Sequence, residues 1–130
     1  MCTGNSCRSQ IAEAYGKKYL KDIEVYSAGI EKHGLNPYML KVMKEDNFDM
    51  KGHYSKTVND LKDIDFDVVV TVCGHANETC PTYLKKTQML HKGFEDPAQA
   101  KGSEDEILDT FRRVRDEIKN YIKNELCNIV

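Results

Sequence analysis

The sequence predicts a single α/β domain over residues 1–130, in which a parallel sheet is flanked by helices. The first observation is the continuously apolar, β-branched run at residues 67–73, typical of a strand buried on both faces. The second is the helical spacing of apolar residues on either side of that run, clearest in the last quarter of the chain. Strands that alternate with helices favour a parallel sheet whose ligands bind at the carboxyl ends of the strands.

The first half of the chain is expected to form three helices and a strand. Apolar side chains at helical spacing predict a helix over residues 9–21, and apolar–polar alternation predicts a short strand over residues 23–28. Asn36 followed by Pro37 is typical of a helix start, and this helix is expected to end near residue 46. A further short helix is expected over residues 59–64.

The second half begins with the buried strand and ends with a long helix. Residues 88–94 form a weaker strand candidate after the run at 67–73. Ser103 and Glu106 have the spacing of a capping box, so they mark the start of the last helix. An apolar stripe then continues to about residue 126, which indicates an amphipathic helix packed on the core.

Composition excludes several classes of protein. A chain of 130 residues can build one hydrophobic core without disulfides. Its net charge of −2 provides no basic surface for nucleic acid, and its apolar runs are too short to cross a membrane. Five cysteines, an odd number, argue against a secreted disulfide framework. We therefore expect a cytoplasmic monomer that binds neither nucleic acid nor a membrane.

A cysteine and an arginine near the start, Cys2 and Arg8, are separated by five residues that lead directly into the first predicted helix. Such a loop can curl so that its backbone N–H groups point at one centre, and the helix adds its positive end. The Arg8 guanidinium matches a tetrahedral oxyanion, and Gly4 gives the curve conformational freedom. The expected oxyanion-binding set is Thr3, Gly4, Asn5, Ser6, Cys7, Arg8 and Ser9.

The chemistry of this loop is expected to centre on Cys2. A field that binds an anion also favours the thiolate over the thiol, so Cys2 becomes a nucleophile at neutral pH, and Ser9 can donate a hydrogen bond to its sulfur. Cys7 is expected to be structural, and Cys127, near the end of the chain, is expected to play no part.

Two further cysteines, Cys73 and Cys80, follow the buried strand. One interpretation is that Cys73 is a small buried hydrophobe and Cys80 an ordinary loop thiol. Because Cys2 is expected to be reactive, we favour a second interpretation, in which the three thiols pass a disulfide from one to the next by exchange. A zinc site formed with His75 or His91 is a third interpretation, but this cysteine spacing is not a common zinc pairing.

Asp96 follows the last strand candidate, so it is expected near the same end of the sheet as the loop. An enzyme that cleaves an oxyanion through cysteine needs a general acid to protonate the departing oxygen, and Asp96 suits that role. The alternative is a turn or capping aspartate, which is common before proline. Glu95 is the adjacent competitor.

The start of the chain does not fit this arrangement. A loop of this type normally leaves the end of a buried strand, yet only Met1 precedes Cys2. We therefore expect that the first strand of the fold is missing, either because the start lies further upstream or because the chain is shortened.

Seven motifs together resemble the thioredoxin-coupled arsenate reductases, which share the fold of the low-molecular-weight protein tyrosine phosphatases. The likeness covers essentially the whole chain from Cys2 onward. These motifs are Cys2-Thr-Gly-Asn-Ser-Cys-Arg-Ser-Gln, Tyr26-Ser-Ala-Gly-Ile-Glu, His33-Gly-Leu-Asn-Pro, Val70-Thr-Val-Cys, Cys80-Pro, Gly93-Phe-Glu-Asp-Pro and Arg113-Val-Arg-Asp-Glu-Ile.

The resemblance implies a reaction. Cys2 would attack the arsenic of an arsenate held by the loop amides and Arg8, while Asp96 protonates the leaving oxygen. Cys73 would then attack Cys2, releasing arsenite, and Cys80 would attack Cys73. Reduced thioredoxin would restore the thiols without a bound cofactor, and phosphate or sulfate would compete with arsenate.

The resemblance also bears on metal binding, because some members hold potassium. Asn5, Glu13 and Ser27 match three of the potassium ligands, but the fourth position falls on Lys56, whose charge opposes a cation. We therefore expect at most a weak potassium site.

Two other functions stay open. A tyrosine phosphatase would use Cys2, Arg8 and Asp96 without the other thiols, although Ala98 and Gln99 stand where such enzymes usually place aromatic residues. An inactive, shortened oxyanion-binding or redox protein is the alternative outside the enzymes.

Overall fold

The computed structural model describes residues 1–2, 4–72 and 88–130. Its longer helices confirm the predicted ones, and its two strands lie within the two runs expected after residue 66. In chain order the elements are α1 (Arg8–Tyr19), α2 (Pro37–Glu45), the 3₁₀ turn η1 (Val58–Leu61), β1 (Val68–Thr71), β2 (Gln88–His91), the 3₁₀ turn η3 (Pro97–Gln99), α4 (Glu104–Asn124) and the 3₁₀ turn η4 (Leu126–Asn128).

The sheet is parallel, as predicted. β1 pairs with β2 in a register that sets Val68 opposite Gln88 and Thr71 opposite His91. On the other edge of β1, the Met1 ammonium donates to the carbonyl of Val70 (2.6 Å). Isolated parallel bridges then join Cys2 to Gly29 and Gly29 to Thr57, so three further segments continue the sheet.

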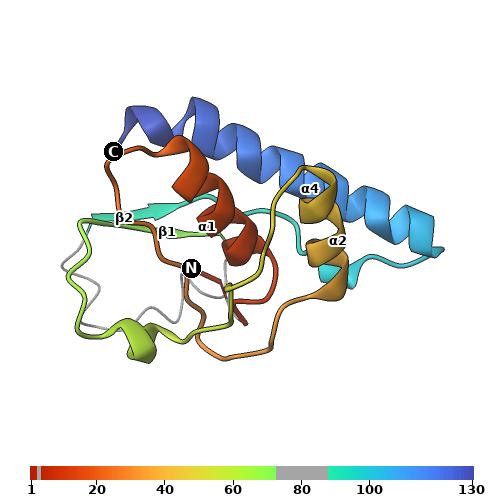
Figure 1. The fold of residues 1–130 in the computed structure, drawn as a ribbon, viewed down its shortest axis with the longest axis horizontal. Coiled ribbons are helices and arrows are strands. Elements are labelled where there is room, and N and C mark those ends of the chain that lie inside the picture. Colours follow the sequence, from red (N-terminus) through yellow and green to blue (C-terminus); the bar gives the residue numbers. More distant parts are fainter. Residues whose placement is uncertain (3, 73–87) are drawn as a thin grey trace.

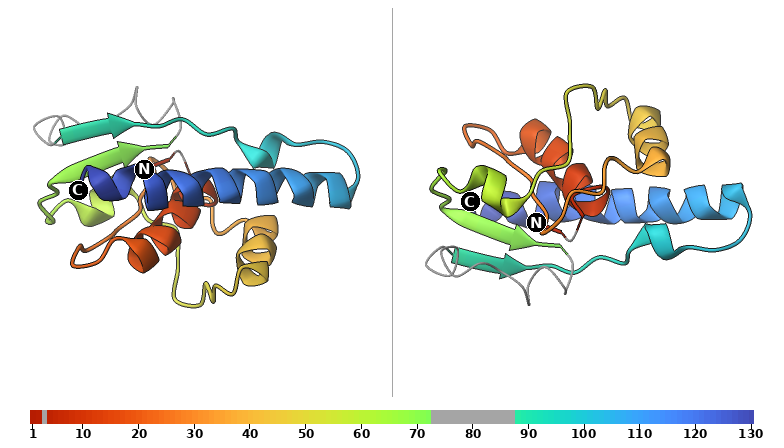
Figure 2. Two further views of the ribbon diagram at one scale, coloured as in Figure 1. Left: turned by 90° about the horizontal axis from the view of Figure 1, so that it is seen from above. Right: turned by 90° about the horizontal axis from the view of Figure 1, so that it is seen from below.

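Helices α1 and α4 lie together on one face of the sheet, and η1 lies on the opposite side (Figures 1 and 2). The main core forms where α1, α2 and α4 meet, which explains why their apolar stripes could be read from the sequence. Its largest fully buried side chains include Tyr15, Phe111, Ile11, Met39 and Ile118. Within the described ranges, no helix is long and apolar enough to cross a membrane.

The predicted helix caps are confirmed. The side-chain oxygen of Asn36 accepts from the backbone N–H groups of Tyr38 and Met39, with Pro37 in the first turn of α2. Ser103 Oγ accepts from the N–H of Glu106 at the start of α4 (3.2 Å). Each cap satisfies N–H groups that have no partner within the helix.

The predicted strand at residues 23–28 is wrong, because this segment has no regular strand pairing. It is linked to the sheet only at its end, where the N–H of Cys2 donates to the Ala28 carbonyl (3.1 Å). Apolar–polar alternation predicts an extended backbone, but a strand also needs a neighbour along its length. The helix expected over residues 59–64 is the shorter turn η1.

Candidate active site

The loop from Cys2 to Arg8 connects the sheet to helix α1. Its first cysteine is buried and is held beside the sheet by the hydrogen bond to Ala28. The N–H of Ile11 donates to the carbonyl of Cys7 (2.9 Å), so the helix begins where the loop ends. The amino end of α1 therefore lies at the loop, where its dipole favours a bound anion.

The side chain of Asn5 holds this loop from behind. Asn5 is fully buried and has a positive φ of 48°, a conformation that asparagine tolerates better than most residues. Its Nδ2 donates to the hydroxyls of Ser9 (2.8 Å) and Ser27 (3.0 Å). Its Oδ1 accepts from the Lys56 N–H and from Gln10 Nε2, both at 2.8 Å. One side chain thus joins the loop to α1 and to two distant segments.

Gly4 is needed for space rather than for backbone freedom, which corrects the sequence-based reason for it. Asn5, and not Gly4, has the positive φ in this loop. A Cβ atom on Gly4 would overlap Nδ1 of His33. The N–H of His33 also donates to the Gly4 carbonyl (3.1 Å), so the two backbones approach closely.

The guanidinium of Arg8 faces the loop that carries Asp96. Its Nη1 donates to the Phe94 carbonyl (3.1 Å), and its Nη2 lies 3.6 Å from Asp96 Oδ2. The other carboxylate oxygen of Asp96 accepts from the Ala98 N–H (3.0 Å) and caps η3. The capping position expected for Asp96 is therefore observed, and its carboxylate also lies beside Arg8. Glu95 instead pairs with the exposed Arg113, away from Arg8.

Backbone pairing beyond β2 brings Asp96 to this place. The N–H of Lys92 donates to the Thr71 carbonyl (2.9 Å), and the N–H of Phe94 donates to that of Val72 (3.0 Å). Phe94 packs against a small cluster formed by Cys2 and Val72. The chain therefore returns to the end of the sheet where the loop begins, as expected for parallel strands.

The second cysteine of the loop, Cys7, is a buried thiol. Burial raises its pKa to about 12, with a smaller contribution from the negative charge of Asp96, while Arg8 opposes the shift. Cys7 therefore remains protonated at neutral pH and does not compete as a nucleophile. Its position agrees with the structural role expected from the sequence.

A buried carboxylate, Glu13, lies behind the loop. Its Oε1 accepts from the N–H (2.9 Å) and the hydroxyl (3.1 Å) of Ser27. The ammonium of Lys56 lies 3.5 Å from the same oxygen, and Nδ1 of His53 lies 2.8 Å from Oε2. Burial lowers the pKa of His53, although the Glu13 charge opposes the shift. The three residues that match potassium ligands by resemblance, Asn5, Glu13 and Ser27, thus lie together, with Lys56 beside them.

The remaining predicted site residues include several that the structure does not describe. Thr3, Cys73, Cys80 and His75 lie outside the described residues, so the thiol relay and the zinc interpretation are not tested by the geometry. Among the residues that are described, no three His, Cys, Asp or Glu side chains form a metal-binding group. His91, the other zinc candidate, has its Nδ1 2.7 Å from the hydroxyl of Thr71.

Sequence reasoning missed several partners of the loop. Gln10 Nε2 and the Ser55 hydroxyl both bond to the Asn5 carbonyl, at 3.2 and 2.8 Å. His53, which the sequence does not indicate as a partner, contacts both Gln10 and Glu13. No spacing in the sequence indicates these partners, because Gln10 and His53 are 43 positions apart and meet only in the folded chain.

Comparison with known proteins agrees with this geometry. The sequence model of the family "Low molecular weight phosphotyrosine protein phosphatase" matches residues 1–129. An arsenate reductase of Halalkalibacterium halodurans is 52% identical over 124 residues, covering 95% of this chain and 89% of the relative. An arsenate reductase of Bacillus subtilis is 50% identical over 128 residues, with the same two coverages.

Solved structures lead to the same family. An arsenate reductase in the reduced state has a TM-score of 0.78 at 30% identity, covering 99% of this chain and 95% of that chain. The arsenate reductase of Archaeoglobus fulgidus has a TM-score of 0.77 at 28% identity, covering 98% and 95%. The family model and these relatives show that this chain belongs to the low molecular weight phosphotyrosine protein phosphatase family, among its arsenate reductases.

Proposed function

We propose that this protein reduces arsenate to arsenite through a thiolate–arsenate adduct on Cys2. The observation that carries the proposal is the approach of Asp96 to within 3.6 Å of Arg8, beside the loop that begins at Cys2. In this proposal Cys2 is the nucleophile, Arg8 binds the oxyanion and Asp96 is the acid. The identity of about 50% to proteins named arsenate reductase supports arsenic as the reacting atom.

Binding would use the loop backbone and Arg8. Backbone N–H groups and the amino end of α1 hold the oxyanion, and the guanidinium offers its planar set of donors. Arg8 reaches the Phe94 carbonyl and Asp96 in the structure, so an arriving arsenate would share or replace these partners. Phosphate and sulfate have the same tetrahedral shape and would compete.

The first chemical step is a displacement at arsenic. The Cys2 thiolate forms the S–As bond as one As–O bond breaks, and Asp96 gives its proton to the departing oxygen, which leaves as water. Thr3, Gly4, Asn5, Ser6, Cys7, Arg8 and Ser9 surround the reacting group in this proposal.

The second part is a relay of two electrons. The Cys73 thiolate attacks the sulfur of Cys2, the S–As electron pair stays on arsenic, and arsenite leaves a Cys2–Cys73 disulfide. Cys80 then attacks Cys73 and frees Cys2. Val72, which directly precedes Cys73, packs with Cys2, and this contact supports the pairing. Reduced thioredoxin supplies the electrons to a cytoplasmic, monomeric enzyme without a bound cofactor.

A coupled assay tests this function. Arsenate-dependent NADPH oxidation is measured with thioredoxin and thioredoxin reductase for the natural chain, Cys73→Ser and Cys127→Ser. The natural chain and Cys127→Ser should turn over equally, and Cys73→Ser should lose turnover. The matched control is suitable because Cys127 lies in η4, where its thiol donates to the Lys123 carbonyl (2.8 Å). Full turnover by Cys73→Ser would exclude the relay.

A phosphatase is the second candidate function. The family model itself describes a phosphatase, and Cys2, Arg8 and Asp96 suffice to hydrolyse a phosphate monoester. Hydrolysis of p-nitrophenyl phosphate by the natural chain and by Cys73→Ser distinguishes a phosphatase from an arsenate reductase. Equal hydrolysis with no arsenate turnover in either protein would favour the phosphatase, whereas no activity of either kind would indicate an oxyanion-binding or redox protein.

A further inference from the structure

Three consecutive carbonyl groups of the loop before α1 are bonded to the rest of the protein. Those of Gly4 and Ser6 accept from backbone N–H groups of the segment that leads into α2, at 3.1 and 2.9 Å. That of Asn5, between them, accepts from Nε2 of Gln10 (3.2 Å) and from the hydroxyl of Ser55 (2.8 Å). Each carbonyl therefore has a fixed direction, and so has the peptide plane that carries it.

The N–H groups of this stretch point the other way. Because the N–H and C=O groups of a planar trans peptide have opposite directions, each bonded carbonyl turns the N–H of the next residue away from the carbonyl's partners. Among the described residues, no acceptor bonds to the N–H of Asn5, Ser6 or Cys7. Asn5 and Cys7 are buried, and a buried N–H group without an acceptor is costly unless an anion binds it. These amides are the donors that the proposed function assigns to the oxyanion.

The Ser55 hydroxyl is the principal donor to the Asn5 carbonyl. Nε2 of Gln10 has two protons but three acceptors: the Asn5 carbonyl at 3.2 Å, Asn5 Oδ1 at 2.8 Å and the Tyr54 carbonyl at 2.9 Å. The two shorter contacts take most of both protons, so the Asn5 carbonyl receives little from Gln10. Ser55 Oγ lies 2.8 Å from that carbonyl, and since a carbonyl oxygen only accepts, the hydroxyl proton points at it.

The segment that carries Ser55 is itself fixed. The N–H of Gly29 donates to the carbonyl of Lys56 (2.8 Å), and Gly29 forms a parallel bridge with Thr57. The N–H of Lys56 also donates to Oδ1 of Asn5 (2.8 Å). Ser55 therefore reaches the loop from a segment that is paired with the sheet, and its hydroxyl has a defined place.

We infer that the Ser55 hydroxyl positions the peptide between Asn5 and Ser6, so that the Ser6 N–H faces a bound oxyanion. Asn5 has a left-handed φ of 48°, a conformation that persists only where surrounding bonds hold it. Without the hydroxyl, the Asn5 carbonyl keeps only its share of the Gln10 amide, and the peptide plane can rotate. Rotation carries the Ser6 N–H out of line with the anion and brings the carbonyl oxygen, which repels an anion, closer to it.

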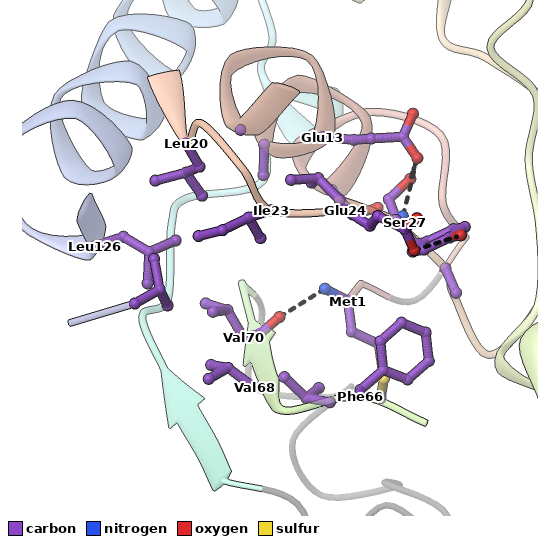
Figure 3. Close-up of a pocket in the computed structure, with 18 of the residues that line it drawn as sticks. Met1, Glu13, Leu20, Ile23, Glu24, Ser27, Phe66, Val68, Val70 and Leu126 are labelled. Carbon is purple, nitrogen blue, oxygen red and sulfur yellow. Dashed lines mark hydrogen bonds between the residues drawn. The ribbon is translucent and has the colours of Figure 1, made fainter. Parts of the chain in front are cut away.

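The side chain of Asn5 is held by other partners, so the effect of the hydroxyl can be isolated. Its Nδ2 donates to the hydroxyls of Ser9 and Ser27. The Ser27 hydroxyl donates in turn to Oε1 of Glu13 (3.1 Å), as Figure 3 shows. None of these bonds involves Ser55. Replacing Ser55 by alanine should therefore leave the loop anchored and change the direction of a single peptide.

Phosphate is the probe, because the role of Ser55 rests on the oxyanion binding of the proposed function and not on the reduction of arsenate. Isothermal titration compares the natural chain with Ser55→Ala and Ser55→Thr. Ser55→Ala should bind phosphate about tenfold more weakly, since one hydrogen bond to a charged group is misaligned. Ser55→Thr keeps the hydroxyl and should bind like the natural chain. Ser55→Cys, with a weaker donor, replaces Ser55→Ala if that variant does not fold.

Ser103→Ala is the matched control. The Ser103 hydroxyl also bonds to one backbone group, the N–H of Glu106 (3.2 Å), but at the start of α4. Its removal should lower stability through the lost helix cap and leave the phosphate affinity unchanged. Thermal melting of every variant separates a loss of stability from a loss of affinity.

The amide of Ser6 gives a spectroscopic signature of the positioning. In isotopically labelled natural chain and Ser55→Thr, the Ser6 amide proton should move downfield when phosphate is added, because a hydrogen bond to an anion deshields it. In Ser55→Ala the same titration should move it much less. A purely structural role of Ser55 would not single out this one amide.

Several results would overturn the role of Ser55. These are unchanged phosphate affinity in Ser55→Ala, an equal loss in Ser103→Ala, a Ser55→Thr variant that binds as weakly as Ser55→Ala, or no saturable phosphate binding by the folded natural chain. If the Ser55 variants behave as expected while the natural chain does not reduce arsenate, the role of Ser55 stands and only the proposed reaction fails.

Discussion

Arg8 and Asp96 lie 3.6 Å apart although 88 positions separate them in the chain, and the Phe94 carbonyl accepts from the same guanidinium. The contact joins the first loop of the molecule to the segment after β2. Because the other oxygen of Asp96 caps η3, each of the two carboxylate oxygens has a partner. The position of the acid thus depends on local capping as well as on the arginine.

Asp96→Asn should lower kcat for arsenate about 100-fold or more, because the amide has no acidic proton for the departing oxygen. The asparagine still caps η3, so stability should change little. Steady-state turnover in the coupled assay measures this. Glu95→Gln is the matched control, since Glu95 pairs with the exposed Arg113, and an equal loss in that variant would remove the assigned role from Asp96.

Cys7 should make the protein less stable in alkali. Its pKa rises on folding to about 12, so the stabilisation is complete below about pH 9 and is lost as pH rises towards 12. Above pH 9 the unfolded chain releases this proton and the folded chain does not, which lowers the free energy of unfolding by up to about 1.4 kcal/mol per pH unit. Urea unfolding at pH 8, 9 and 10 measures the slope, and Cys7→Ala should show a shallower one.

Lys56→Met should destabilise the fold by about 3 kcal/mol, because it leaves the buried Glu13 carboxylate without its nearest buried ammonium. Methionine keeps the apolar stem, so lost packing contributes little. Lys17→Met is the control: Lys17 also lies 3.5 Å from Glu13 but is exposed, and its removal should cost about 0.5 kcal/mol. Similar costs in urea unfolding would contradict the role of the buried lysine.

Turnover should be the same in potassium and in tetramethylammonium buffers. The Lys56 ammonium already lies 3.5 Å from Glu13, so a second cation near Asn5 and Ser27 would be repelled. The coupled assay at constant ionic strength measures this. A marked loss of turnover without potassium would show that a cation binds beside the lysine.

Gly4→Ala should weaken oxyanion binding at least about tenfold, because the new methyl group would overlap the His33 ring and displace the loop. Isothermal titration with phosphate measures the affinity. Adding His33→Gly should restore much of the binding, since it removes the obstructing ring. Gly93→Ala is the control, because its Cβ would lie 3.6 Å from the nearest atom, an ordinary contact.

Local signals were sufficient for much of the fold. The Asn36 and Ser103 caps are short-range features, and both place their helices correctly. The segment at residues 23–28 shows the limit, because alternation describes its backbone but not the presence of a neighbour. Strand pairing is a property of two segments, and one segment alone cannot reveal it.

The candidate site likewise has a part that local sequence predicts and a part that only the structure reveals. The spacing of Cys2 and Arg8 marks the loop, because five residues and a helix start are local. The partners of Asn5 at Ser27 and Lys56 are 22 and 51 positions away, so no spacing rule indicates them. Similarly, neighbours of Glu13 could be predicted only through the resemblance. One of its neighbours, His53, is known only from the structure.

The bonded amide of Asn5 also has a thermodynamic consequence. The nitrogen and the oxygen of this amide both form hydrogen bonds within the protein, so the curvature of the loop is set during folding. The entropy of ordering that backbone is then lost before any oxyanion arrives. Association can consequently be fast and reversible, which suits a loop that would capture a new arsenate in every cycle of the proposed reaction.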